Sequence, residues 1–208
     1  MALRLGCRCF SSRLGSKRER VSSRSLSLVV RMTHMELRFP IAEIREFSDR
    51  YVAELRERDR RLTDAITQQV FPSYEQKGYL TKAEFLTVCA WKTPRSQPRC
   101  ANNDAAFIRE ISSLARTTQS EQLRIQAWTL LAGVKWPTAS VFLHFAFADR
   151  YPILDYRALW SLRTTDVPYT FALWQNYTEF CRTLARRAGV TMRGLDQALW
   201  KYSELHQR

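Results

Sequence analysis

Apolar side chains recur every three or four residues along most of the chain from Ile41 onward, the spacing of amphipathic helices. No stretch shows a sustained alternation of apolar and polar residues, so strands are not expected. The first helices should cover residues 41–51 and 61–70, and Pro72 should end the second. The pattern predicts an all-α, compact multi-helix domain of about eight helices.

Later in the chain, several sets of apolar residues fall on single helical faces and are candidates for the core. The sets are Phe107, Ile111 and Leu114; Leu123, Ala127, Leu130 and Leu131; Leu173, Tyr177, Phe180, Cys181 and Leu184; and Leu195, Ala198, Leu199 and Tyr202. Residues 138–148, TASVFLHFAFA, are apolar almost all round, which predicts a central buried helix. His144 in that helix is interpreted as a satisfied core group. Trp128, Trp174 and Trp200 are interpreted as packing residues.

Capping residues divide this pattern into elements. Thr81-Lys-Ala-Glu84 and Thr118-Gln-Ser-Glu121 have the spacing of capping boxes, and Asn102 or Asn103 could cap the helix between them. WKTPRSQPR, residues 91–99, is expected to be a basic loop. Gly133 should end a helix, and Pro137 suits the first turn of the next.

Composition supports a folded domain with a basic extension. Of the 208 residues, 45% are hydrophobic and 12% aromatic, too many for a disordered chain. The net charge is +13, and residues 1–31 carry eight Lys/Arg but one Glu. We therefore predict a disordered basic extension over residues 1–35 and a single domain over residues 36–208. The extension could be a mitochondrial transit peptide, a phosphate-binding arm or a spurious upstream start, which is the interpretation we favour. A cytoplasmic, nucleoid-associated protein is expected, or a mitochondrial or nuclear one if residues 1–31 are a targeting segment.

Ligand-binding patterns are sparse. The five cysteines include no C-x-x-C pair, and no apolar run approaches the length of a membrane span. We expect no metal, no cofactor and no membrane partner.

One short region carries the functional signal. Its order is helix, L-x-G-V-x-x-x-T-A, apolar helix, Pro152-containing loop and Asp155, with Asp155 16 residues after Ala139. The residues that match the hairpin pattern are Leu131, Gly133, Val134, Thr138 and Ala139. Over roughly 30 residues, this resembles the helix-hairpin-helix/Gly-Pro-Asp DNA glycosylase superfamily and its endonuclease III-like core.

The resemblance implies a monomeric DNA-binding enzyme that removes a modified or damaged base. Its hairpin would hold the DNA backbone through Gly133, Val134, Lys135 and Thr138, with N–H groups and a helix N-terminus facing phosphate. A flipped base would enter a pocket, where Asp155 would stabilise the oxocarbenium-like sugar or activate water.

Two hairpin positions depart from the family pattern. Lys135 replaces its second glycine, and Pro137 stands where bifunctional members carry a Schiff-base lysine. A monofunctional glycosylase without lyase activity is therefore expected. A non-catalytic helix-hairpin-helix DNA-binding module is the alternative, and a helical protein–protein adaptor is a third. Asp155 could also be a simple N-cap, and Gly133 a simple αL helix stop.

Residues that could contact the base or fill its place in the duplex adjoin predicted loops. They are Trp91, Lys92, Arg95, Trp136, Tyr156 and Arg157. Trp91 and Trp136 could stack on bases. Arg157 could pair with a phosphate or with Asp155 and keep the carboxylate ionised.

Overall fold

A computed structural model describes residues 35–207 of the chain, so the expectations for residues 1–34 fall outside the part described. The described residues belong to one compact unit and are helical without strands. The α-helices are α1 (Ile44–Ala53), α2 (Glu57–Ala65), α3 (Phe71–Lys77), α4 (Lys82–Lys92), α5 (Gln97–Ala101), α6 (Ala105–Thr117), α7 (Glu121–Gln126), α8 (Trp136–Ala146), α9 (Tyr156–Ser161), α10 (Phe171–Ala188) and α11 (Met192–His206). The all-α prediction is confirmed, with more and shorter segments than expected.

Pro72 does not end a helix, contrary to expectation. One π-helical turn, η2 (Ile66–Val70), joins α2 to α3, and the N–H of Phe71 donates to the carbonyl of Ile66. Proline disrupts a regular helix because it lacks an N–H and its ring meets the carbonyl four residues back. The wider turn shifts the hydrogen-bond register just before Pro72, which then lies in the first turn of α3.

Of the N-terminal caps predicted for α4, α6 and α7, the first is present and the other two differ from the prediction. The capping box of Thr81 and Glu84 is present. The cap of α6 is Asp104, which accepts from two backbone N–H groups, rather than Asn102 or Asn103. Ser120 caps α7, while Thr118 ends α6, so the second predicted capping box is wrong.

The buried face of α6 is rotated from the predicted one. Ile108, Ile111, Ser112 and Ala115 are buried, whereas Phe107 and Leu114 are exposed. Leu123 and Leu130 are exposed as well, because residues 127–130 form a 3-10 turn, η4 (Ala127–Leu130), that breaks the expected stripe.

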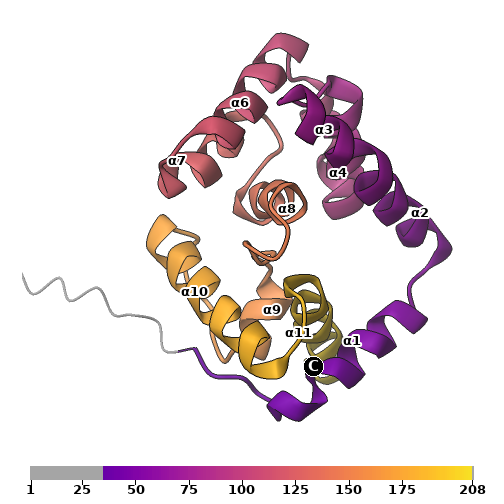
Figure 1. Cartoon of the computed structure of the whole chain (residues 1–208), viewed down its shortest axis with the longest axis vertical. Helices are drawn as coiled ribbons and strands as arrows, with labels where there is room; N and C mark the ends of the chain where they lie inside the picture. Colours follow the sequence, from indigo (N-terminus) through magenta and orange to yellow (C-terminus); the bar gives the residue numbers. More distant parts are fainter. Residues whose placement is uncertain (1–34, 208) are drawn as a thin grey trace, which may run out of the picture. The chain divides into compact units, whose positions relative to one another are not determined.

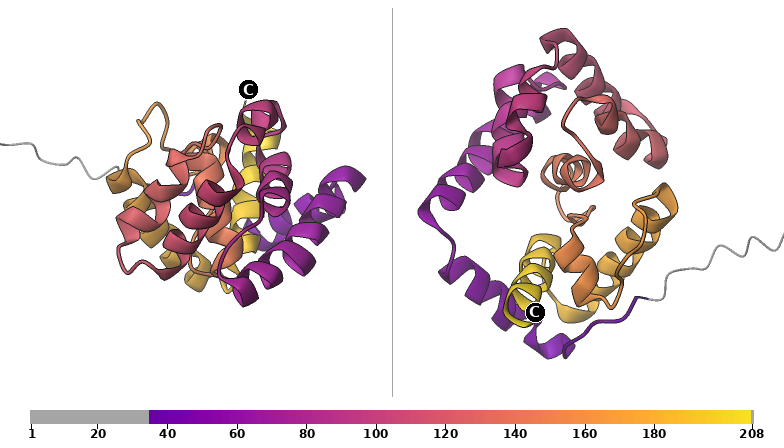
Figure 2. Two further views of the ribbon diagram at one scale, coloured as in Figure 1. Left: turned by 90° about the horizontal axis from the view of Figure 1, so that it is seen from above. Right: turned by 180° about the vertical axis from the view of Figure 1, so that it is seen from behind.

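Helix α8 is the central element, as predicted. Residues Thr138 to His144 are all buried. α3, α4, α6 and α7 lie on one side of α8, and α1, α9, α10 and α11 on the other (Figures 1 and 2). The Phe142 ring lies between those of Trp128, at 4.2 Å, and Phe85, at 5.5 Å, nearly parallel to both. Trp128 and Trp174 are fully buried, which confirms their packing role.

The two ends of the described chain meet in one group of helices. The N–H groups of Glu36 and Arg38 donate to the carbonyls of Leu162 and Ser161, at 3.1 and 2.9 Å. Helix α1 then packs along α11. Within residues 35–207, no helix combines the length and apolar character needed to cross a bilayer.

Candidate active site

The predicted hairpin is a tight turn held by one buried amide. Asn103 Oδ1 accepts from the N–H of Ala132 at 2.8 Å, and Asn103 Nδ2 donates to the carbonyls of Ala132 and Cys100, both at 2.9 Å. The N–H of Val134 donates to the carbonyl of Leu131 at 3.1 Å, which closes the turn. Asn103 thus ties the turn to the end of α5.

Gly133 adopts the left-handed conformation that the sequence predicts, with φ +81°. The side of Gly133 on which a Cβ atom would lie is filled by α5, because that atom would meet Cys100 Sγ at 2.7 Å and the Cys100 backbone N at 2.9 Å. The missing side chain makes room for α5 rather than for a ligand.

The outward-facing part of the hairpin is the start of α8. Lys135 is its exposed N-cap residue, with no capping side chain, and Pro137 lies in its first turn as predicted. Val134 and Thr138 are buried, and the Val134 N–H is already used within the turn. The Lys135 side chain and the positive end of the α8 dipole therefore remain to attract an anion.

The loop after α8 is fixed by buried hydrogen bonds from three helices. Ser140 Oγ of α8 accepts from the N–H of Leu154 at 2.9 Å. Asp196 of α11 accepts from the N–H of Ile153 at 3.1 Å, and Tyr177 Oη of α10 donates to the Ile153 carbonyl at 2.9 Å. The backbone just before Asp155 is therefore tied to three separate helices.

Asp155 uses its two carboxylate oxygens differently. Oδ1 accepts from the N–H of Arg157 at 2.8 Å and caps α9, while Oδ2 pairs with the ammonium of Lys92 from α4. The side chains of Asp155 and Lys92 are 14% and 15% exposed, so the pair is neither deep in the core nor on the open surface. Lys92, rather than the Arg157 side chain, is the cation that pairs with this carboxylate.

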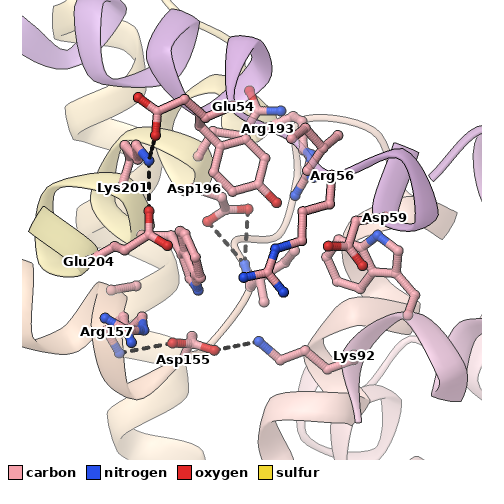
Figure 3. A pocket seen from close by; sticks show the side chains of 17 residues that line it. Glu54, Arg56, Asp59, Lys92, Asp155, Arg157, Arg193, Asp196, Lys201 and Glu204 are labelled. Atoms are coloured by element: carbon pink, nitrogen blue, oxygen red, sulfur yellow. Dashed lines mark hydrogen bonds and ion pairs between the residues drawn. The ribbon is translucent and has the colours of Figure 1, made fainter. Parts of the chain in front are cut away.

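Asp155 and Lys92 line a cavity of about 650 Å³, large enough for a nucleobase (Figure 3). Its walls come from α1, α2, α4, α9, α11, the α1–α2 connection and the loop before α9. The lining residues include Tyr51, Glu54, Arg56, Asp59, Trp91, Lys92, Ile153, Asp155, Arg157, Arg193, Asp196, Trp200, Lys201 and Glu204.

A second carboxyl group, Asp196, lines the same cavity but is 5% exposed. Burial raises its pKa to about 8, against the attraction of Arg193 and Lys92, and the charge of Asp155 adds to the rise. His144 Nδ1 lies 2.8 Å from the Tyr151 carbonyl and 3.1 Å from Asp196 Oδ2. Burial lowers the pKa of His144 to about 3, helped by the positive charge of Arg193, so His144 is a neutral core group as predicted.

The other carboxylates that line the cavity each have a basic partner. The buried ammonium of Lys201 contacts carboxylates of both Glu54 and Glu204, the latter at 2.7 Å (Figure 3). Asp59 pairs with Arg58 at 3.2 Å. These pairs neutralise the acidic residues of the cavity wall.

The other predicted base-contacting residues divide between the cavity and the rest of the surface. Trp91, Lys92 and Arg157 line the cavity, but Trp91 is the penultimate residue of α4 and donates from Nε1 to Thr63 at 2.9 Å. Arg95, Trp136 and Tyr156 are not among its lining residues, and exposed Tyr156 lines a separate hollow beside Leu159.

Four contributors are not predicted by the local sequence: Asn103, Arg193, Asp196 and Trp200. Asn103 lies 29 positions from Ala132, and the three α11 residues lie far along the chain from the cavity residues of α1 and α4. Arg193, Asp196 and Trp200 do recur at helical spacing on α11, which places them on one face. That periodicity is the one signal that could have associated them.

Within residues 35–207, no group of three or more His, Cys, Asp or Glu side chains is arranged to hold a metal ion. No family model, curated protein or solved structure matches this chain.

Proposed function

We propose that the protein is a monofunctional DNA N-glycosylase, in which Asp155 supports hydrolysis of the bond between sugar and base. The observation that carries the proposal is the carboxylate of Asp155 in the wall of a base-sized cavity. The segment that resembles the hairpin, residues 131–139, does not line this cavity. α8 connects the two features, since it begins at the hairpin and its Ser140 binds the loop that leads to Asp155.

The chemistry requires a fixed negative charge close to the sugar. Breaking the N-glycosidic bond develops positive charge on the ring, which an ionised carboxylate stabilises. The Arg157 N–H and the Lys92 ammonium hold the two oxygens of the Asp155 carboxylate in place at the cavity wall. When a nucleotide enters, Oδ2 is the oxygen that would face the sugar or a water while still paired with Lys92, because Oδ1 is held by the helix cap.

DNA binding is assigned to the start of α8 and the cations around the cavity. Lys135 and the uncapped helix N-terminus suit a phosphate without reading sequence. Arg56 and Arg157 line the cavity and have no carboxylate partner within residues 35–207. Both can bind phosphates on either side of a flipped nucleotide.

Replacing Asp155 with Asn tests the proposal. Asn caps a helix about as well as Asp, so α9 should persist while the charge disappears. Base release from a panel of modified duplexes should fall by about a hundredfold or more, with DNA affinity retained. Asp104→Asn is the matched control, because Asp104 also caps a helix but lies away from the cavity. Equal activity in the two variants would remove Asp155 from the mechanism.

Borohydride trapping tests whether the enzyme is monofunctional. Pro137 carries no amine, and the Lys92 ammonium is held in its ion pair with Asp155. We therefore expect an abasic product and no covalent protein–DNA adduct on reduction. A trapped adduct that disappears in Lys92→Gln would show that Lys92 supplies lyase chemistry instead.

A non-catalytic DNA-binding module is the second candidate. It is favoured by the engagement of both Asp155 oxygens in protein contacts, as in a structural cap with an ion pair. Salt-dependent DNA binding without base release across the panel would support this candidate over the glycosylase.

A further inference from the structure

Arg193 of α11 occupies an unusual place in the cavity wall. Its guanidinium carbon lies 5.3 Å from the ring centre of Trp91 and 5.7 Å from those of Tyr51 and Phe145. These contacts hold the planar group among aromatic faces without using its N–H donors. Among residues 35–207 it has no ion-pair partner, although it lies close enough to Asp196 and His144 to influence their charge.

One of its donors is buried without an acceptor. Arg193 Nη2 is inaccessible and makes no hydrogen bond to any described residue. Buried donors are satisfied in the great majority of folded proteins, because leaving one unpaired is costly. Nη2 has no accessible surface, so a base in the cavity would meet the other donors of this group, Nε and Nη1, which also make no hydrogen bond to any described residue and are not buried.

The charges around the cavity restrict what that ligand can be. Among its carboxylates, Glu54 and Glu204 pair with Lys201, Asp59 with Arg58, and Asp155 with Lys92. The carboxyl group of Asp196 accepts a hydrogen bond from the Ile153 N–H and lies 3.1 Å from His144 Nδ1. Each aromatic ring that lines the cavity already lies against an arginine: Tyr51 and Trp91 against Arg193, and Trp200 against Arg157. A positively charged base would find neither a free carboxylate nor a free aromatic cage here, but a neutral base with a carbonyl would find a donor.

We infer that Arg193 selects the base, by donating to a carbonyl oxygen or unprotonated ring nitrogen, so that the site takes neutral oxo-bases and rejects cationic N-alkylpurines. This inference rests on the proposed base-excision function. Uracil, hypoxanthine and 8-oxoguanine belong to the accepted class, and 7-methylguanine, which carries a positive charge, belongs to the rejected class.

The test compares these four bases in one duplex sequence. Single-turnover excision by the full chain is measured for each. Binding is measured in parallel with the Asp155→Asn protein and the same bases on 2′-fluoro sugars, which resist cleavage. Arg193→Met removes the donors and the charge but keeps the length of the side chain. Arg187→Met is the matched control, because Arg187 is exposed on α10 and does not line the cavity.

We expect the parent protein to favour the best oxo-base over 7-methylguanine by about tenfold or more, as a site with an unpaired donor should. Arg193→Met should lose this preference in excision and in binding, and Arg187→Met should keep it. Arg193→Lys retains the cation but not the planar fork of donors, so it should still reject 7-methylguanine while handling oxo-bases more slowly. This milder variant serves as the test if Arg193→Met does not fold.

The outcomes separate the two proposals. Excision of 7-methylguanine as fast as the oxo-bases, or an unchanged preference in both Arg193 variants, would overturn the role of Arg193 and leave the glycosylase standing. No excision, together with an Arg193-dependent binding preference, would overturn the glycosylase and leave base recognition by Arg193 standing. Neither excision nor a binding preference would overturn both.

Discussion

Replacing Gly133 with Ala tests whether the hairpin is packed tightly against α5. The new methyl group would lie 2.7 Å from Cys100 Sγ and 2.9 Å from the Cys100 backbone N. The backbone nitrogen belongs to a helix and cannot move away without shifting α5. Two costs therefore combine, one from the left-handed backbone conformation and one from steric overlap.

The magnitude can be worked out with an internal reference. Gly78 has nearly the same φ, +80°, but a Cβ atom added there would have nothing within 4 Å, so Gly78→Ala carries the conformational cost alone. That cost is about 1–2 kcal/mol for a non-glycine residue in this region. Overpacking at Gly133 adds about 1–3 kcal/mol. The loss of unfolded-state entropy on changing Gly to Ala is the same in both variants and cancels in the comparison.

Thermal unfolding of both variants measures the difference. In a protein of this size, each kcal/mol lowers Tm by about 2–4 °C, so Gly133→Ala should unfold about 2–12 °C below Gly78→Ala. Calorimetry at one pH and protein concentration is sufficient. Equal Tm values would refute the close packing of the hairpin on α5.

Three further predictions concern the hairpin and the cavity. Asn103→Ala leaves buried backbone partners unsatisfied and should lower the free energy of unfolding by about 1–3 kcal/mol, measured in urea; an unchanged midpoint would contradict the clamp. The pKa of Asp196 is about 8 in the folded protein, against 3.8 ordinarily, so folding favours the protonated carboxyl group. The resulting contribution to stability is fully present below about pH 4 and is lost as pH rises through about 8. Asp196→Asn should therefore flatten the dependence of unfolding free energy on pH over that range, and an equal slope in both proteins would argue against a protonated Asp196. Lys135→Ala should weaken DNA binding and reduce the slope of log affinity against log salt by about one, whereas an unchanged slope would remove Lys135 from the phosphate contact.

The sequence alone determined those features that depend on neighbours within a few residues. The Thr81 capping box, the positive φ of Gly133 and the position of Pro137 at the start of α8 are local geometry. The buried character of α8 follows from its almost uniformly apolar composition, and the cap at Asp155 from a short polar side chain just before a helix. Such interactions close small loops and need little help from the rest of the chain.

Tertiary structure decided the choices that the local sequence leaves nearly equal in energy. Asp104 rather than Asn103 caps α6, because Asn103 is buried and bound to the hairpin. Which apolar residues of α6 are buried depends on where α7 and η4 pack, so Phe107 is exposed and Ile108 is not.

The candidate site shows the same division most clearly. The sequence predicts Asp155 as a site residue from its spacing to the resembled segment, but Lys92 lies 63 positions from it along the chain, and Asp196 lies 43 positions from Ile153. The ion pair of Asp155, the pKa of Asp196 and the unpaired nitrogen of Arg193 depend on burial and on through-space contacts. No pattern along the sequence encodes those distances, because they exist only once α4, α9 and α11 enclose a common cavity.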